Sequence, residues 1–157
     1  MNRSDLYLRA EALQHRTART GEHVGVLYID IDGFKVVNDT HGHYVGDVIL
    51  RAAAERLAAA GRKDDVVARV GGDEFVILLS TLHSDEDALA VAKDVVEKFR
   101  EPLEAEGKSI TLGVSVGVAL ALPDETADDT LRRADAALYE AKLRGRGQAV
   151  RWSLDLL

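Results

Sequence analysis

The chain has 157 residues, 46% of them hydrophobic, which suits one ordinary globular domain with a continuous core. Its 20 Lys and Arg residues against 27 Asp and Glu residues give a net charge of -7, which argues against a general grip on nucleic acid or on an anionic membrane. Any phosphate site in this chain must therefore be locally basic.

Cysteine is absent, so disulfides and thiolate metal sites are excluded, and the composition fits a reducing cytoplasm. No run approaches the ~18 apolar residues of a transmembrane helix, and no charged-then-apolar signal segment opens the chain. We expect a soluble, cytoplasmic domain without membrane contact in this stretch, whether or not a longer parent protein is anchored.

The first half of the chain predicts a helix, a buried strand, a polar loop and a second helix. Residues 4–20 place apolar side chains on one helical face behind Ser4, a suitable N-cap. The run from Val24 to Ile31 is too continuously apolar for a half-exposed strand, so we place it in the interior of a sheet. After a polar loop, apolar residues recur at helical spacing from Val45 to Leu57.

A β-hairpin is predicted next. Two apolar runs, Val66 to Val70 and Phe75 to Leu79, lie on either side of the pair Gly71-Gly72. Two adjacent glycines suit the positive φ angles of a tight hairpin turn.

The last part of the chain adds two helices and a long strand. Ser84 and Asp87 resemble a capping box, and Pro102 should end the helix that follows them. Residues 110–122 read as one strand, and a final helix should stop near Gly145 before a short terminal strand. This order predicts an α/β fold with a mixed central sheet flanked by helices.

One catalytic motif fails on inspection. Residues 113–117 match the pattern of a nucleophile elbow around Ser115, but that motif needs a helix directly after the serine, whereas apolar strand residues follow here. All five histidines also precede Ser115, the wrong order for that hydrolase fold. We therefore reject a serine hydrolase.

Asp32 lies just after the buried strand, and taken alone we interpret it as a solvated carboxylate at a strand end.

Two separate groups of carboxylates should converge at one end of the sheet. Asp30 closes the buried strand, and Asp73-Glu74 follow the glycine pair of a hairpin that should pair beside it. Hard oxygen ligands of this kind suit Mg²⁺ or Mn²⁺ carrying substrate phosphates. We expect Asp30, Asp73 and Glu74 to act together.

At this hairpin the sequence resembles a known family. Residues 71–75 read Gly-Gly-Asp-Glu-Phe, the signature of GGDEF domains, or diguanylate cyclases. Further segments agree in order and spacing: residues 30–35, Asn38-Asp39, Gly42-His43, Gly46-Asp47, Arg69, residues 115–117, Ala134-Asp135, Leu138-Tyr139, Ala141-Lys142 and Gly145-Arg146. The resemblance covers residues 2–150 and implies a fold like the palm of nucleotidyl cyclases and polymerases.

The resemblance also implies roles for individual residues. Asp30, the carbonyl of Ile31 and Asp73 would hold the metal ions, Mg²⁺ or Mn²⁺, with Glu74 assisting. The substrate-binding group would comprise Phe34, Lys35, Asn38, His43, Asp47, Lys142 and Arg146. Its three cations would meet the triphosphate, and Asn38 and Asp47 would read the guanine edge, whose two N–H donors suit a carboxylate acceptor.

The implied reaction joins two GTP molecules into cyclic di-GMP and two pyrophosphates. Each chain would hold one GTP, so catalysis would need a homodimer. Arg62 and Asp65 form an RxxD pattern placed as in the family's product-inhibition site, at which cyclic di-GMP would bind. A charged turn after Gly61 is the plainer alternative for these two residues.

The sequence departs from the family pattern at two places. It begins Met1-Asn2-Arg3, as though cut inside an opening segment that members usually carry, so we expect residues 1–157 to be a single catalytic domain from a larger multidomain signalling protein. Gly147 stands where asparagine is common. A non-catalytic module that binds GTP or cyclic di-GMP is the main alternative function, and a nucleotide-sugar transferase is a more distant one.

Overall fold

A five-stranded sheet forms the centre of the domain. The computed structural model describes residues 3–62 and 64–156, and the sheet has the order β2-β3-β1-β6-β7. Its strands are β1 (His23–Ile31), β2 (Val66–Arg69), β3 (Glu74–Leu82), β6 (Val114–Leu120) and β7 (Ala149–Arg151). All neighbours are antiparallel except β6 and β7, which are parallel, so the predicted mixed sheet is confirmed.

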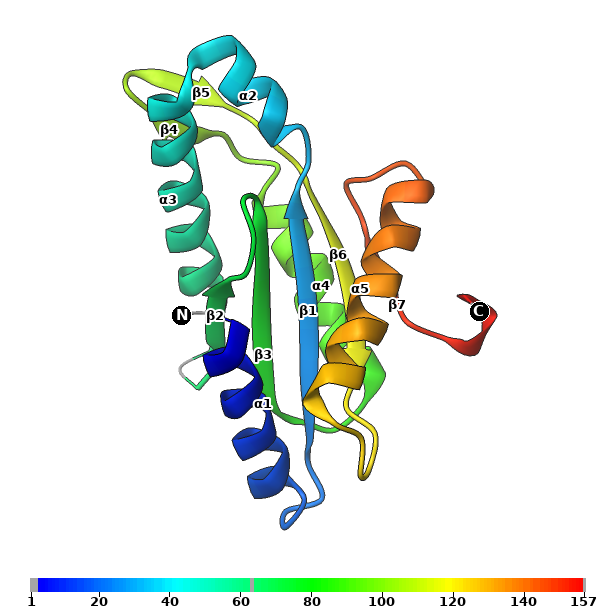
Figure 1. The fold of residues 1–157 in the computed structure, drawn as a ribbon. Helices are drawn as coiled ribbons and strands as arrows, with labels where there is room; N and C mark the ends of the chain where they lie inside the picture. The colour runs from blue at the N-terminus through cyan, green and yellow to red at the C-terminus, as the bar shows by residue number, and fades with distance from the viewer. Residues whose placement is uncertain (1–2, 63, 157) are drawn as a thin grey trace.

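Helices cover both faces of this sheet (Figure 1). On one face lie α1 (Arg3–Thr17) and α5 (Ala127–Leu143), and on the other lie α3 (His43–Ala60) and α4 (Asp85–Lys98). Strand β1 is buried along almost its whole length because alternate side chains enter the two cores, with Val26 on the α1 and α5 side and Leu27 on the α3 and α4 side. The central position predicted for this strand is confirmed.

The predicted polar loop after β1 is wrong, because part of it is helix α2 (Phe34–His41). Its buried side chains, Phe34 and Val37, are three residues apart and pack into the core shared with α3. The helix is short and its N-cap, Gly33, offers no side-chain hydrogen bond, so the usual starting signals are missing.

The predicted strand over residues 110–122 is also partly wrong. Its first residue belongs to a separate hairpin of β4 (Leu103–Ala105) and β5 (Lys108–Ile110), and β6 begins only at Val114. Between β4 and β5 the residues Glu106 and Gly107 both have positive φ, 51° and 76°, as a two-residue hairpin turn requires. The hairpin lies at the end of the molecule that also carries α2 (Figure 1).

The segment after β7 contacts Arg133 of α5. The Arg133 guanidinium donates hydrogen bonds of 2.6 and 2.7 Å to the Glu125 carboxylate and one of 2.6 Å to the carbonyl of Leu120. The same guanidinium lies 4.7 Å from the centre of the Trp152 ring, a cation–π contact. A short 3₁₀ helix, η1 (Leu154–Leu156), follows.

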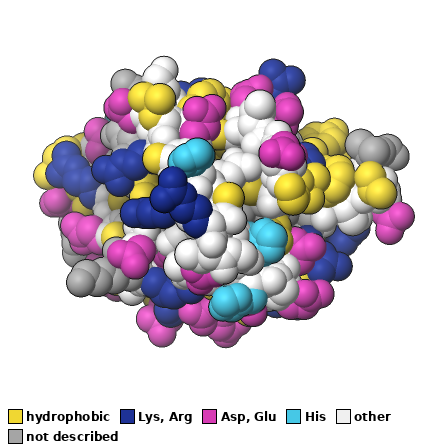
Figure 2. Space-filling model, turned by 90° about the horizontal axis from the view of Figure 1, so that it is seen from below, with side chains coloured by type: hydrophobic (Ala, Val, Ile, Leu, Met, Phe, Trp, Pro, Cys, Tyr) yellow, Lys and Arg dark blue, Asp and Glu magenta, His cyan; other side chains and the backbone are white. Residues whose placement is uncertain are grey.

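The surface opposite the carboxyl end of β1 carries mixed charge. Figure 2 shows this end, where basic and acidic side chains lie interspersed.

Among the residues described, no helix combines the length and the apolar character that crossing a membrane requires.

Candidate active site

The carboxylates that the sequence singled out lie together. Asp30, the next-to-last residue of β1, is the direct antiparallel partner of Glu74, the first residue of β3. Asp73 precedes it in the turn, and its carbonyl accepts a hydrogen bond of 3.1 Å from the amide of Ile31. The pairing of β1 with β3 therefore brings all three carboxylates to one sheet edge, as predicted.

The turn that carries Asp73 forms as predicted, but the reason given for its glycines is wrong. Neither Gly71 nor Gly72 has positive φ. A Cβ atom on Gly71 would instead lie 2.9 Å from Glu74 Oε1, so the absence of a side chain makes room for that carboxylate. Arg69 then fastens the turn by donating to the carbonyls of Gly71 and Gly72 at 2.8 to 3.1 Å.

Burial and mutual repulsion disfavour simultaneous ionisation of these carboxyl groups. Burial raises the pKa of the Asp73 carboxyl above its ordinary value, and the charge and hydrogen bond of Asp30 raise it further. Burial likewise raises the pKa of Glu74, again with a contribution from Asp30. Lys142 on α5 pairs with Asp30 Oδ2 and opposes both shifts. Additional positive charge at this site would therefore favour the ionised forms of these carboxyl groups.

The donor set fits a divalent cation that arrives with phosphates. Asp30 is only 8% exposed, and its Oδ1 atom is buried without a hydrogen-bond partner. Within the described residues no three His, Asp or Glu side chains form a cluster able to hold a metal by themselves. Mg²⁺ commonly takes one or two carboxylates and completes its shell with water and substrate phosphates. Asp30 and Asp73, with the nearby Ile31 backbone, suit that kind of binding.

The predicted triphosphate cations come from two elements. Lys142 lies in the last turn of α5, Arg146 follows the end of that helix, and Lys35 is exposed in the first turn of α2. Arg146 Nη1 lies 3.6 Å from Asp32 Oδ1, while Lys142 contacts Asp30. Phe34, in contrast, is 7% exposed with its ring in the core, so its side chain is not available to a substrate.

The predicted base-reading residues lie on two helices that pack together, Asn38 on α2 and Asp47 on α3. A Cβ atom on Gly46 would lie 1.8 Å from Asn38 Oδ1, so this glycine lets the Asn38 amide enter the helix interface. Asp47, the next residue, is exposed and lines a cavity of about 390 Å³ together with Arg69 and Phe75. That volume lies within the usual range of small-molecule pockets. His43 is exposed at the start of α3.

The interpretation of Asp32 as a solvated carboxylate is wrong. Its side chain is 14% exposed and accepts hydrogen bonds of 2.7 Å from Ser115 Oγ and 3.0 Å from the amide of Gly147. Ser115, fully buried in β6, also accepts from the Gly147 amide at 3.2 Å. Sequence reasoning missed this cluster because its members are separated by 83 and 115 residues.

Comparisons with known proteins agree with this geometry. The family model described as "Diguanylate cyclase, GGDEF domain" matches residues 1–148. The chain belongs to the GGDEF family. Among solved structures, the GGDEF domain of TpbB from Pseudomonas aeruginosa superposes with a TM-score of 0.92 at 34% identity, covering 98% of this chain and 97% of that one. The GGDEF domain of DgcB from Caulobacter crescentus, solved in complex with cyclic di-GMP, gives 0.86 at 27% identity, covering 96% and 90%.

Curated relatives are much longer proteins. The bifunctional diguanylate cyclase/cyclic di-GMP phosphodiesterase MucR of P. aeruginosa is 38% identical over 92% of this chain and 21% of MucR. The diguanylate cyclase TpbB is 39% identical over 87% of this chain and 31% of its own length. The cyclic di-GMP phosphodiesterase NbdA, at 37% identity, also matches. This GGDEF domain thus spans about a fifth to a third of such relatives.

The RxxD pair of this GGDEF domain lies away from the carboxylates, ahead of β2. Asp65 Oδ2 accepts a 2.8 Å hydrogen bond from the backbone amide of Arg62, while Asp65 Oδ1 is buried without a partner. The Arg62 guanidinium is half exposed and donates to the Ser80 carbonyl at 2.7 Å. Asp65 also lines a cavity of about 550 Å³ whose other walls include Arg9 and Arg16 of α1.

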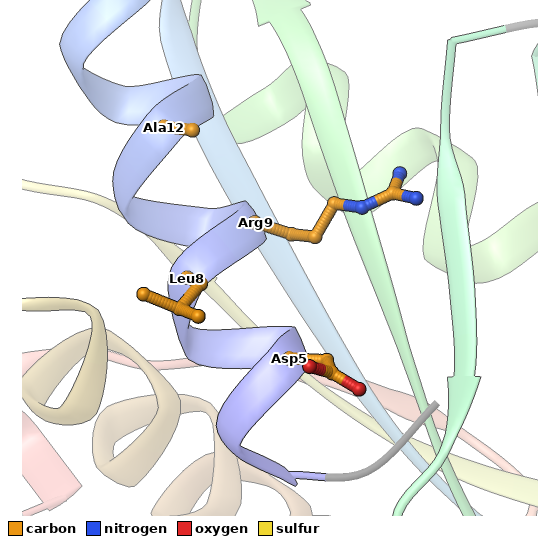
Figure 3. A pocket seen from close by; sticks show the side chains of 4 residues that line it. All are labelled: Asp5, Leu8, Arg9 and Ala12. Atoms are coloured by element: carbon orange, nitrogen blue, oxygen red, sulfur yellow. The ribbon is translucent and has the colours of Figure 1, made fainter.

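A neighbouring hollow on α1 contains none of the predicted site residues. Figure 3 shows Asp5, Leu8, Arg9 and Ala12 around it, with Arg9 reaching from the helix toward β2. Its volume, about 560 Å³, is comparable to that of the cavity at Asp65. Size alone therefore does not identify the site, whereas the chemistry of the lining residues does.

Proposed function

We propose that this GGDEF domain is a diguanylate cyclase, which condenses two GTP molecules into cyclic di-GMP and two pyrophosphates. The observation that carries the proposal is that strand pairing of Asp30 with Glu74 brings Asp30 beside Asp73, with Asp30 Oδ1 buried and without a hydrogen-bond partner. Its 39% identity to the diguanylate cyclase TpbB supports the same reading.

In this proposal the carboxylates hold Mg²⁺ or Mn²⁺. Asp30, Asp73 and the Ile31 carbonyl provide the protein oxygens. When bound, such an ion lowers the pKa of a hydroxyl and neutralises charge at phosphorus. Lys142, Arg146 and Lys35 supply the remaining positive charge to the triphosphate, and Arg146 does so with a planar, always protonated group.

The chemistry is a displacement at the α-phosphorus. The 3′-oxygen of one GTP forms the new P–O bond, the bond to pyrophosphate breaks, and pyrophosphate leaves with the displaced electron pair. Glu74 accepts the hydroxyl proton, a role that its raised pKa suits because a stronger base is a better proton acceptor. A second, reciprocal displacement closes the ring.

Each chain contributes half of the reacting geometry. One GTP lies on one domain, with its guanine at Asn38 and Asp47 near the cavity beside Arg69, and His43 at the edge of that site. A second copy of the chain brings the other GTP, so the active species is a homodimer. We further propose a cytoplasmic location, in which GTP is at hand.

The product would also bind away from the active site. We propose that Arg62 and Asp65 form an inhibitory site for cyclic di-GMP, a proposal that the cavity lined by Asp65 supports because it offers space for a bulky ligand. The cyclic di-GMP complex solved for the related DgcB domain supports recognition of this product by GGDEF domains.

Product analysis tests the proposal directly. Incubating the chain with GTP and Mg²⁺ should yield cyclic di-GMP, and Asp73→Asn or Asp30→Asn should abolish it in a folded protein because a metal ligand is lost with little change in volume. Asp94→Asn, at an exposed position on α4, is the matched control and should keep normal turnover. Binding of GTP without any turnover would instead indicate a non-catalytic regulatory module.

A further inference from the structure

We infer that Asp32 and Ser115 are positioning residues that hold the loop after α5 in the shape that presents Arg146 to the triphosphate. The inference rests on the proposed function, because it takes Arg146 as a phosphate-binding group. It assigns a task to two side chains that neither hold the metal nor touch the reacting atoms.

The loop after α5 has an unusual backbone. Helix α5 ends in a Schellman motif, in which the amides of Arg146 and Gly145 donate to the carbonyls of Ala141 and Lys142 at 3.0 and 3.3 Å. Three successive residues then have positive φ: 114° at Gly145, 64° at Arg146 and 63° at Gly147. For glycine this costs little, but for Arg146 the left-handed conformation is unfavourable by about 1 kcal/mol or more.

Such a conformation persists only if surrounding contacts hold it. The Gly147 amide is bound from two sides, by Asp32 Oδ2 at 3.0 Å and by Ser115 Oγ at 3.2 Å. Ser115 in turn donates to Asp32 Oδ1 at 2.7 Å, which fixes the carboxylate. Gly147 itself adopts its left-handed φ of 63° at little cost, because glycine has no Cβ atom.

Burial strengthens these contacts. Ser115 is fully buried in β6 and Asp32 is 14% exposed, so water competes weakly for their hydrogen bonds. The carboxylate lies close to the residue before β6, since a Cβ atom on Gly113 would be in ordinary van der Waals contact with Asp32 Oδ2 at 3.5 Å. Asp32 also lies 3.6 Å from Arg146 Nη1 and thereby orients the guanidinium itself.

The test measures nucleotide binding rather than turnover. The probe is 3′-deoxy-GTP with Mg²⁺, which cannot react because it lacks the attacking hydroxyl. Asp32→Ala should weaken its binding roughly tenfold, the usual effect of losing one charge-assisted hydrogen bond. In an Arg146→Ala background the same change should cost less than about twofold, because the residue through which Asp32 acts is gone.

A second measurement reads the loop itself. Amide hydrogen exchange at Gly147 should accelerate in Asp32→Ala and in Ser115→Ala. If Asp32→Ala does not fold, Ser115→Ala still provides the test. Equal losses of affinity with and without Arg146, or an unchanged Gly147 exchange rate, would overturn the inference. If the variants show this coupling in 3′-deoxy-GTP binding but the wild type makes no cyclic di-GMP from GTP, the positioning role stands and the proposed synthesis is refuted.

Discussion

The ammonium group of Lys142 on α5 pairs with the carboxylate of Asp30 at the end of β1, and both side chains are mostly buried, at 26% and 11% exposed. Burial raises the pKa of Asp73 and of Glu74, Asp30 adds to the rise, and Lys142 opposes it. The positive charge of Lys142 therefore limits how far the pKa values of Asp73 and Glu74 rise.

Replacing Lys142 by methionine should move the acidic side of the activity profile to higher pH. The pKa of Asp73 and Glu74 should rise further, so a higher pH is needed to obtain the ionised forms. The profile of kcat/KM over about pH 5 to 9 checks this. Lys142→Arg keeps the charge and should shift the profile less, and an unchanged profile in Lys142→Met would contradict the electrostatic role.

The same shifts fix a sign for stability. A carboxyl whose pKa is raised on folding binds its proton more tightly in the folded state, so its contribution is present at low pH and is lost as pH rises through the folded pKa. Lys142→Met should therefore lose stability relative to wild type mainly at neutral pH and recover it under acid conditions. Urea unfolding at both pH values measures the difference.

Asp47→Ser should relax the preference for GTP over ATP. Guanine offers two donors to a carboxylate, whereas adenine has an acceptor at N1, so losing the carboxylate removes the discriminating contact. Each hydrogen bond to a charged group contributes about 1.5 to 3 kcal/mol, so selectivity should fall roughly tenfold or more. Competition kinetics measure it. Asp39→Ser, at an exposed position on α2, is the control, and unchanged selectivity in Asp47→Ser would remove Asp47 from the base site.

Arg62→Ala should weaken cyclic di-GMP binding while synthesis at low product concentration continues. Guanidinium contacts to phosphate or guanine are worth about 1.5 to 3 kcal/mol, or roughly a tenfold to hundredfold change in Kd. Calorimetry with the product gives the comparison. Arg132→Ala removes an arginine that is 76% exposed and should bind as wild type does. Equal affinity in both variants would restore the simple charged turn.

The rate per chain should rise with protein concentration. Two GTP molecules on separate chains must be brought into register, and orientation can contribute roughly 7 to 11 kcal/mol that a lone chain lacks. We expect initial rates at saturating GTP and Mg²⁺ to increase more steeply than linearly in dilute enzyme, and fusion to a parallel coiled coil to raise them. A strictly linear dependence, while sedimentation finds only monomer, would refute the shared active site.

Strong local patterns predicted much of this fold. The buried run that became β1 and the carboxylates at its end were readable because continuous apolar residues and a glycine pair are short-range signals. Helix α2 was missed because its eight residues carry only two buried side chains and no side-chain cap. The hairpin of β4 and β5 was missed because each strand has just three residues.

The contacts within the site were less accessible to sequence reasoning. The residues expected at the metal and at the triphosphate were predicted from the resemblance to the GGDEF family. Their contacts, however, depend on how strands that are distant in the sequence pair in the folded domain. Asp32 looked like a solvated strand end because Ser115 and Gly147, its partners, lie far along the chain. Gly71 was expected for its backbone freedom, whereas the space it leaves for Glu74 is a property of the folded turn.

The cation–π contact between Arg133 and Trp152 gives the domain a built-in optical reporter. Trp152 is the single tryptophan of the chain, and its ring lies against the guanidinium of Arg133 in α5, which also binds the Glu125 carboxylate ahead of that helix. Indole emission depends on local polarity and on neighbouring charge, so fluorescence should follow the docking of α5 on the sheet without any added label. Comparing this signal with circular dichroism during denaturation would show whether the helix that carries Lys142 comes away with the rest of the fold or before it.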